Sequence, residues 1–259
     1  MNQSRTVIKN RQQDILDYIR SNKTLSVADA SEIFQVSPLT IRRDFQTLED
    51  QKLITRFHGG AAYNNSSFKE EIHLEEKKTL HEKAKEAIGK HVASMIPEGA
   101  TLFLNSGTTT LSVLKYLNDK RVQVITNNAL APTVVHSDSI NLILTGGECR
   151  NQSKSMVGTS AVEAVSKIYS SWCILGANGI SNMGMTTSVY AETQINEMMV
   201  MNCKGKVVLV ADGSKIGKNF DFFSVPSRDI DMLVTDSSAS PEELAKMEKQ
   251  GIEIIKLEV

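Results

Sequence analysis

Apolar residues recur at helical spacing in three short segments near the start of the chain. Their spacing predicts helices over residues 10–21, 27–35 and 37–50. In the third segment Ser37 is a favourable N-cap, and Pro38 suits the first helical position because its missing N–H would have no intrahelical partner there. Ile41, Phe45 and Leu48 then form one buried stripe. Three short helices with a tight turn before the third predict a helix-turn-helix.

The remaining faces of the third helix carry hydroxyl and guanidinium groups, on Thr40, Arg42, Arg43 and Thr47. These groups suit contacts with phosphates and with guanine edges in a DNA major groove. An ordinary surface helix also carries arginines on its exposed side, so the helix alone leaves both interpretations open.

Residues 53–61 follow with the sequence LITRFHGGA, which predicts a small hairpin wing of basic and glycine-rich character. Arg56 and His58 are placed there to contact phosphates. The pattern therefore predicts a mainly α winged helix-turn-helix whose third helix lies in a nucleic-acid groove. The candidate DNA-binding residues are Ser37, Thr40, Arg42, Arg43, Thr47, Arg56 and His58.

From residue 97 onward, short apolar runs alternate with helical segments. The runs cover residues 101–104, 122–126, 141–144, 172–175, 207–211, 232–234 and 252–256. Such alternation predicts an α/β domain with a largely parallel sheet and helices on both faces. Polar residues separate the two patterns, so we expect a DNA-binding domain over 1–61, a linker over 62–79 and the α/β domain over 80–259.

Ligands of open α/β sheets gather at the carboxyl ends of the strands. Residues 105–110, NSGTTT, come directly after the first apolar run and before a predicted helix. Gly107 lets the backbone turn tightly, and helix-start N–H groups with the Thr108 and Thr109 hydroxyls would form an anion pocket suited to phosphate. A capping loop without a ligand would have the same sequence.

Four further strand ends carry small polar residues. They are 126–128 (TNN), 145–148 (TGGE), 176–179 (GANG) and 211–215 (ADGSK). A polyol sugar needs many neutral hydrogen-bonding groups, and its phosphate needs one or two cations. These loops offer both, so they favour a phosphorylated sugar or polyol as the ligand.

The 259-residue chain is 41% hydrophobic and 23% charged with net charge −1, which is typical of a soluble globular protein. Residues 1–60 hold nine Lys and Arg against seven Asp and Glu, a mildly basic balance that allows DNA binding through a few well-placed cations. Cys149, Cys173 and Cys203 are odd in number and far apart, which argues against disulfides and structural zinc and favours buried thiols. The chain shows no membrane-length apolar segment or signal-peptide core, so we expect a cytoplasmic protein. We also expect it to need no metal or cofactor.

Three blocks in the first 61 residues resemble one known family. They read RxxxIxxxI over 11–19, VSPLTIRRDF over 36–45 and LITRFHGGA over 53–61. Together and in this order they resemble the amino-terminal domain of the DeoR family of bacterial transcriptional regulators. The resemblance implies a winged helix-turn-helix that binds operator DNA, usually as a repressor.

The strand-end loops resemble, in order, the carboxy-terminal sensor domain of the same family, whose fold is similar to that of ribose-5-phosphate isomerase. This resemblance implies that residues 106–109 hold the phosphate of an effector and that Lys215 lies near the same ligand. Asn105 stands where family members commonly carry aspartate, a change expected to alter hydrogen bonding to the ligand. The candidate effector-binding residues are Asn105, Ser106, Gly107, Thr108, Thr109, Asn127, Gly146, Gly147, Asn178, Glu192 and Lys215.

The isomerase-like fold makes a sugar-phosphate isomerase the alternative function. Isomerisation needs a general base, with acids and cations that stabilise an enediolate. The isomerases place an aspartate pair in a D-G-A-D-type segment, which here reads LGAN over 175–178, so both carboxylates are missing. Glu192 matches the isomerase glutamate, but without its partners it fits a ligand-binding or structural group better. A protein-binding adaptor is a third possibility, although Arg42, Arg43 and the basic wing favour DNA.

We therefore expect a DNA-binding transcriptional regulator, a repressor of a carbohydrate-utilisation operon. A phosphorylated sugar or polyol is expected to change its operator affinity. We also expect a homo-oligomer, a dimer or tetramer, because one short helix reads too few base pairs and symmetric half-sites are the usual remedy.

Overall fold

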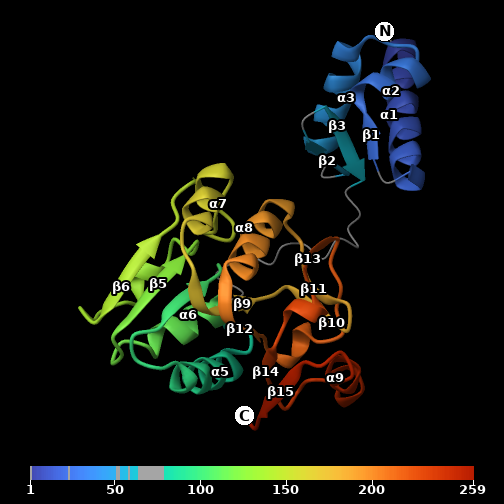
Figure 1. The fold of residues 1–259 in the computed structure, drawn as a ribbon. Coiled ribbons are helices and arrows are strands. Elements are labelled where there is room, and N and C mark those ends of the chain that lie inside the picture. The colour runs from blue at the N-terminus through green and yellow to red at the C-terminus, as the bar shows by residue number, and fades with distance from the viewer. Residues whose placement is uncertain (1, 23, 51–52, 58, 64–78) are drawn as a thin grey trace. The chain divides into compact units, whose positions relative to one another are not determined.

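The computed structural model of the protein describes residues 2–22, 24–50, 53–57, 59–63 and 79–259. The chain divides into two compact units, Met1–Glu70 and Glu71–Val259 (Figure 1). The first unit contains α1 (Asn2–Asn22), β1 (Thr24–Ser26), α2 (Val27–Ile33), α3 (Pro38–Asp50), β2 (Ile54–Phe57) and β3 (Gly60–Tyr63).

A small apolar core holds the helices of the first unit together. Ile15 and Ile19 of α1 pack with Ile41, Phe45 and Leu48 of α3, and all five side chains are buried. Strands β2 and β3 pair antiparallel as the predicted wing, and β1 adds to the other edge of β3. The predicted helix-turn-helix with its wing is therefore confirmed. Strand β1 was not predicted, because three residues are too few to show a period.

The second unit is built on a seven-stranded parallel sheet in the order β15-β14-β12-β9-β4-β5-β6. The strands of this sheet are β4 (Thr101–Leu104), β5 (Val122–Thr126), β6 (Ile140–Leu144), β9 (Ser170–Gly176), β12 (Cys203–Val210), β14 (Met232–Asp236) and β15 (Glu253–Leu257). All seven lie on the predicted apolar runs, which confirms the predicted fold class.

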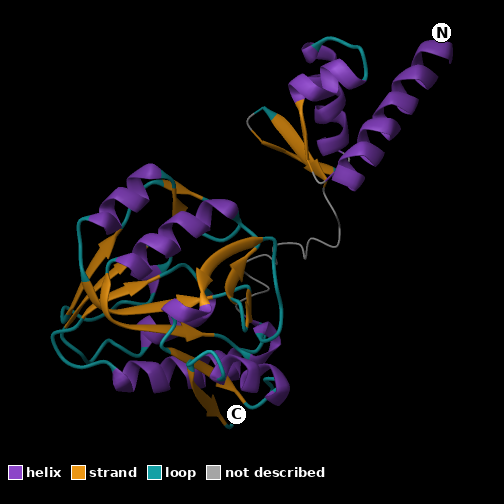
Figure 2. Cartoon of the chain, turned by 45° about the vertical axis from the view of Figure 1, so that its right-hand side comes forward, coloured by secondary structure: helices purple, strands orange, loops and turns teal. Residues whose placement is uncertain are grey.

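Helices cover both faces of this sheet (Figure 2). They are α5 (Glu82–Met95), α6 (Thr108–Lys115), α7 (Thr159–Ser166), α8 (Tyr190–Met201) and α9 (Pro241–Glu248). Side chains of β4 alternate between the two layers: Leu102 and Leu104 pack with α5 and α6, whereas Phe103 packs with α7 and α8. No helix in the described part of the chain has both the length and the apolar character needed to cross a membrane.

Shorter strands border the main sheet. Strands β7 (Glu148–Cys149) and β8 (Met156–Val157) form a hairpin, and β10 (Gly179–Ser181), β11 (Gly184–Thr187) and β13 (Phe222–Pro226) form an antiparallel sheet. The sequence did not predict them. Strands β7, β8, β10 and β11 have two to four residues with glycine at one end, which read as loops, and β13 ends in proline.

The strand order changes direction between β4 and β9. From β4 the chain moves to β5 and then to β6, whereas β9, β12, β14 and β15 extend the sheet on the other side. Open α/β sheets bind their ligands in the crevice outside the carboxyl ends of the strands at such a point. The loops that follow β4 and β9 meet there.

Candidate DNA-contact surface and effector pocket

Helix α3 begins at the cap that the sequence predicts. The Ser37 hydroxyl accepts a hydrogen bond from the Thr40 backbone N–H at 3.2 Å and lies 2.9 Å from the Thr40 hydroxyl. The Thr47 hydroxyl donates to the Arg43 carbonyl at 3.0 Å. All three hydroxyls thus have partners within the α3 region, so their first effect is to shape the helix.

Arg42 and Arg43 lie exposed on α3. Within the described part of the chain, neither guanidinium has an ion-pair or hydrogen-bonding partner. Exposed guanidinium groups without a protein partner are available to phosphate oxygens and to the major-groove edge of guanine.

A buried ion pair fixes α3 against α1. Asp44 is only 3% exposed; its Oδ2 accepts a hydrogen bond from Arg11 Nε at 2.7 Å, and its Oδ1 accepts bonds from Arg11 Nη2 at 3.2 Å and Gln12 Nε2 at 3.0 Å. This bidentate contact gives both carboxylate oxygens a hydrogen-bond donor and sets the orientation of the two helices. Sequence analysis missed the pair. The available signal was an aspartate beside Ile41 and Phe45 on the buried stripe.

Arg56 on β2 is already engaged by α3. Its Nη1 donates to Gln46 Oε1 and lies 3.8 Å from Glu49 Oε2, while its backbone N–H donates to Glu49 Oε1 at 3.0 Å. These contacts hold the wing strand beside the helix. A phosphate bound by Arg56 would therefore compete with the Glu49 carboxylate. His58, the other predicted wing contact, lies outside the described residues.

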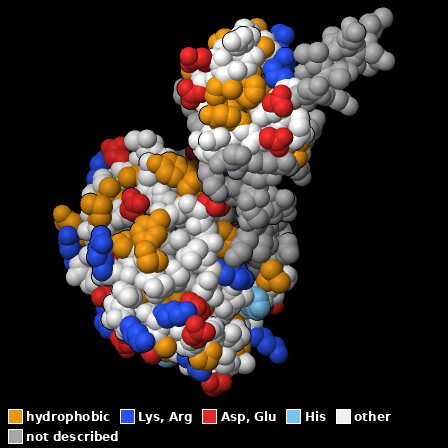
Figure 3. Space-filling view, turned by 90° about the vertical axis from the view of Figure 1, so that its right-hand side faces the viewer, with side chains coloured by type: hydrophobic (Ala, Val, Ile, Leu, Met, Phe, Trp, Pro, Cys, Tyr) orange, Lys and Arg blue, Asp and Glu red, His pale blue; other side chains and the backbone are white. Residues whose placement is uncertain are grey.

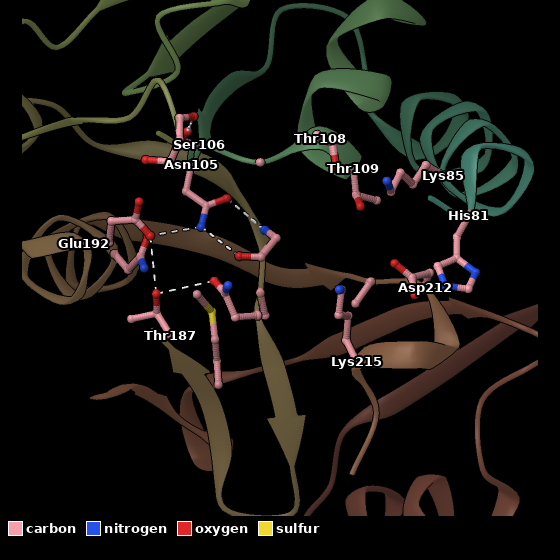
Figure 4. Close-up of a pocket in the computed structure, with 18 of the residues that line it drawn as sticks. His81, Lys85, Asn105, Ser106, Thr108, Thr109, Thr187, Glu192, Asp212 and Lys215 are labelled. Carbon is pink, nitrogen blue, oxygen red and sulfur yellow. Dashed lines mark hydrogen bonds and ion pairs between the residues drawn. The ribbon is translucent and has the colours of Figure 1, made fainter. Parts of the chain in front are cut away.

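The second unit has a cavity of about 80 Å³ at the point where β4 and β9 diverge (Figure 4). Eight predicted effector-binding residues line it: Asn105, Ser106, Gly107, Thr108, Thr109, Asn178, Glu192 and Lys215. Because one water needs roughly 10–15 Å³ of such space, the cavity suits a small polar ligand.

One side of the cavity gathers cations around the start of α6. Gly107 precedes the helix, and Thr108 and Thr109 open its first turn, where the backbone N–H groups have no intrahelical partner. Lys85 of α5 and Lys215 point towards this turn from two directions (Figure 4). Lys85 is only 5% exposed. Helix-start N–H groups, hydroxyls and ammonium groups are the kinds of donor that bind anions in proteins.

Lys215 lies on a short turn, η2 (Gly213–Lys215), that follows β12. The buried carboxylate of Asp212 caps this turn by accepting the Ser214 backbone N–H at 3.1 Å. His81, the residue before α5, places its Nε2 4.0 Å from Asp212 Oδ1. Asp212 therefore connects the turn that carries Lys215 with the start of α5.

A second carboxylate supports the same turn from β14. Asp236 Oδ1 accepts the Gly213 N–H at 2.5 Å, and Oδ2 accepts the Ser238 N–H at 3.2 Å. Burial raises the pKa of Asp236, but hydrogen bonds from Ser238 and from the Gly213 backbone outweigh that effect and lower it below its ordinary value. A Cβ on Gly213 would lie 2.3 Å from the Ala239 nitrogen, so the turn packs too closely for a larger residue.

The opposite side of the cavity carries a carboxylate that hydroxyl groups hold. Ser155 donates to Glu192 Oε1 at 2.7 Å, and Thr187 donates to Glu192 Oε2 at 3.3 Å. The Thr187 hydroxyl also lies 3.4 Å from Asn178 Oδ1. Glu192 and Thr187 lie across the cavity from Lys85 and His81 (Figure 4). Acceptors on this side suit the hydroxyl groups of a ligand, whereas the cationic side suits its anion.

Asn105, which lines the cavity, joins β4 to β9. Its buried Nδ2 donates to the Gly176 carbonyl at 2.9 Å and to Asn196 Oδ1 at 3.1 Å, and its Oδ1 accepts the Gly176 N–H at 2.8 Å. Both amide hydrogens are therefore used within the protein. An aspartate at this position could not donate to the Gly176 carbonyl. The side chain positions the two strand ends, so the change from aspartate acts on the framework of the pocket.

Three predicted effector-binding residues do not line this cavity. Asn127 is buried and donates its Nδ2 to the Met156 carbonyl at 3.0 Å. Gly146 and Gly147 form a turn with φ of 68° and 97°, and a Cβ on Gly147 would lie 2.5 Å from the Val157 carbonyl oxygen. All three follow strands on the far side of β4 from β9. Asn127 and Gly147 pack against β8 instead.

Several further residues line the cavity. Gly176, Ala177, Ala211 and Asp212 belong to the strand-end loops 176–179 and 211–215 that sequence analysis singled out, although they were not candidate site residues. The other lining residues are Leu80, His81, Lys85, Ser153, Met185, Thr187 and Asn196, and none of them was a candidate site residue. Lys85, Ser153 and Asn196 do not follow a strand of the main sheet, so attention to strand ends could not find them. For Lys85, the available signal is a lysine in register with Ile88 on the buried stripe of α5.

The three cysteines are free, and burial raises the pKa of the Cys173 thiol. Cys149 is exposed, so the expectation that all three thiols are buried is wrong for that residue. Among the described residues, no three His, Cys, Asp or Glu side chains come together as metal ligands.

Two family models match the chain. The DeoR-like helix-turn-helix domain matches residues 11–67, and the DeoR C terminal sensor domain matches residues 80–237. The second match alone spans more than half of the sequence. The chain belongs to the DeoR family.

Curated members of the DeoR family resemble the chain over most of its length. The glycerol-3-phosphate regulon repressor of Escherichia coli (strain K12) is 35% identical over 212 residues, which are 81% of this chain and 83% of that protein. The lactose phosphotransferase system repressor of Streptococcus mutans is 31% identical, over 92% of this chain and 96% of that protein. The HTH-type transcriptional repressor GlcR of Bacillus subtilis (strain 168) is 29% identical, over 93% of each chain.

The solved structures that this DeoR-family chain resembles include ribose 5-phosphate isomerases. Ribose 5-phosphate isomerase A from Methanocaldococcus jannaschii aligns with a TM-score of 0.38 and 14% identity, covering 52% of this chain and 54% of that one. The relatives are named as transcriptional repressors, and the helix-turn-helix domain is present. The chain is thus a transcriptional regulator and not an enzyme, which removes the isomerase alternative.

Proposed function

We propose that this DeoR-family regulator represses a carbohydrate-utilisation operon and that a phosphorylated sugar or polyol changes its affinity for operator DNA. The cavity between the ends of β4 and β9 carries the proposal, because Lys215 and the first turn of α6 face Glu192 across it. Two relatives named after a glycerol-3-phosphate regulon and a lactose phosphotransferase system support control of carbohydrate genes.

The two sides of the cavity suggest how the effector lies in it. Its phosphate binds the first turn of α6, with the Thr108 and Thr109 hydroxyls and the Lys215 ammonium as donors. Its hydroxyl groups donate to Glu192 and Asn178 on the opposite side. A neutral sugar would give Lys215 no anion, so the phosphorylated form is the ligand.

The DNA-binding domain, residues 1–61, places α3 in the major groove. Arg42 and Arg43 contact base edges and phosphates, and Ser37, Thr40 and Thr47 contact the flanking backbone from the same helix. Arg56 and His58 of the wing contact phosphates. To do so, the Arg56 guanidinium leaves the Glu49 carboxylate and binds a DNA phosphate instead. Because the cations are few, we expect modest affinity for a single half-site and two half-sites in the operator.

Residues 62–79 connect this domain to the effector domain, residues 80–259. In a dimer or tetramer, effector binding draws the loop 106–109 and Lys215 together and changes the arrangement of two DNA-reading heads. The effector can do so only if it binds the two arrangements with unequal affinity.

Fluorescence anisotropy of the full chain on a duplex from its own upstream region tests the proposal. We expect binding that weakens with salt at a log–log slope of about −0.9 per neutralised phosphate. One member of a panel of sugar phosphates should shift the affinity, and its unphosphorylated counterpart should not.

Two results would contradict the proposal. If the protein binds neither this duplex nor a pool of genomic duplexes, it does not act through operator DNA. If DNA binding is tight but no sugar phosphate alters it, the role of the cavity is wrong.

A further inference from the structure

The second unit, Glu71–Val259, is called the sensor unit below. Besides the effector cavity it has a groove of about 720 Å³ between α8 and β13. Three large apolar side chains on it lie in solvent: Met183 is 65%, Met201 69% and Phe223 49% exposed. Val200 and Val225 continue the apolar lining. Hydrophobic side chains gather in patches on the side of this unit that carries β10, β11 and β13 (Figure 3). Several large apolar side chains exposed along one groove suit an interaction site.

The same groove carries charges of both signs. Glu197 of α8 is exposed, and within the described part of the chain it has no ion-pair partner. The Arg228 side chain is 83% exposed, and among the described residues its one ion-pair partner is its neighbour Asp229, at 3.8 Å. A surface that meets its own copy across a two-fold axis presents every patch twice, so it needs both signs for opposite charges to face each other. Glu197 and Arg228 meet that condition.

We propose that the groove between α8 and β13 docks a second copy of this chain. In the dimer, Met201 of each copy lies in the apolar groove of the other, and Glu197 faces Arg228 across the two-fold axis. An apolar centre with a charged rim is the usual build of such contacts. The inference rests on the proposed function, because only an oligomer presents two DNA-reading heads.

Helix α8 forms a wall of both sites. Glu192 and Asn196 line the effector cavity, whereas the last turns of the helix line the groove. Asn196 also connects them: its Oδ1 accepts a hydrogen bond from Asn105 at 3.1 Å, and its Nδ2 donates to the Ser224 hydroxyl of β13 at 3.1 Å. A ligand that moves α8 against β13 therefore changes the docking surface directly. This arrangement places effector control at the contact between the two copies.

Sedimentation equilibrium of the full chain with and without Met201→Glu tests the docking surface. A carboxylate at this position would be buried in the apolar groove of the partner, so we expect the dimer dissociation constant to rise at least about tenfold. At a concentration low enough to keep both proteins monomeric, the melting temperature of the sensor unit should be the same in the two, because Met201 is exposed within one copy. Tyr169→Glu is the matched control: Tyr169 is 67% exposed but lies outside the groove, and its substitution should leave the dimer intact.

Charge exchange tests the two-fold pairing itself. Arg228→Glu and Glu197→Arg should each weaken the dimer, and the double variant should restore it, because opposite charges then face each other again. A wild-type chain that stays monomeric at micromolar concentration, or a Met201→Glu variant that associates like the wild type, overturns the proposal. Operator binding measured on the same samples separates the two failures, since a wrong surface leaves DNA binding of the wild type intact.

Discussion

Arg42 and Arg43 on α3 lie in solvent without a partner in the described part of the chain, whereas Asn105, Glu192 and Asp212 at the effector cavity are all held by hydrogen bonds from the protein. DNA offers a dense row of phosphates, so free cations on a well-supported helix suffice to bind it. A small ligand offers few contacts, so the groups around it must be positioned beforehand. Substitutions in the two regions should therefore fail in different ways, through lost contacts on α3 and through lost positioning at the cavity.

The largest loss of unfolding free energy is expected at Asp44, the buried residue of α3 that pairs with Arg11 of α1. Asp44→Ala removes the buried partner of Arg11, so the DNA-binding unit should lose about 3–5 kcal/mol of unfolding free energy. Urea unfolding of the full chain, followed by circular dichroism, measures the loss. Asp50→Ala, at an exposed position of the same helix, should cost less than about 0.5 kcal/mol. Equal stability of the two variants would show that α3 does not depend on the ion pair.

Asn105→Asp tests positioning at the effector cavity. The new side chain cannot donate to the Gly176 carbonyl, so the sensor unit should lose roughly 2–3 kcal/mol at pH 7. Its protonated carboxyl can donate as the amide did, so the deficit relative to the wild type should shrink as the pH falls towards 5. Fluorescence of Trp172 on β9 follows the unfolding. Asn219→Asp, at an exposed loop position, serves as the control, and a pH-independent deficit would contradict this explanation.

Arg42→Ala tests the loss of a direct contact. If Arg42 reads a base, operator affinity should fall by about 1–3 kcal/mol while the melting temperature stays the same. Operator affinity is measured by anisotropy titration of the duplex. Arg121→Ala removes an exposed arginine of the sensor unit and serves as the control for the change in net charge. Identical operator affinities of the two variants would refute the role of Arg42.

The smallest effect is expected from Asp236→Asn. The pKa of Asp236 is lowered in the folded protein, so its carboxylate stabilises the fold above the ordinary pKa of 3.8, and that contribution is lost as the pH falls through the folded value. The variant should lose about 1 kcal/mol at pH 7, and its difference from the wild type should shrink only as the pH falls below 3.8, through the lowered pKa of the folded protein. Thermal unfolding over this pH range, with exposed Asp119→Asn as the control, measures the effect. A difference that grows on acidification would mean that Asp236 does not support the turn as ionised carboxylate.

Signals contained within a few residues made most of the fold predictable. The Ser37–Pro38 start of α3 and the continuous apolar runs of the seven main strands are of this kind. The extent of the antiparallel strands β10, β11 and β13 depends on pairing between segments that are far apart, so their own residues read as loops. The Arg11–Asp44 pair depends in the same way on how α1 packs against α3.

The effector cavity was predictable in part, for a similar reason. Residues that follow β4, β9 and β12 reach it, as their strand-end positions suggest. Asn127, Gly146 and Gly147 also follow strands, yet β5 and β6 lie on the other side of β4. Strand order decides which loops meet, and local sequence does not encode that order. Lys85 enters the cavity from a helix, and only its buried position in the heptad-like stripe of α5 sets it apart.

The most direct test of the account is an effector titration of operator-bound protein, with Lys215→Ala and Lys218→Ala beside the wild type. The sugar phosphate identified in the panel serves as the probe. All three proteins should bind the operator equally, and Lys218→Ala should respond like the wild type, since Lys218 is exposed outside the cavity. Lys215→Ala should need at least about tenfold more effector, because a charge-assisted hydrogen bond contributes roughly 1.5–3 kcal/mol. A Lys215→Ala protein that responds at the wild-type effector concentration would contradict the placement of the effector phosphate.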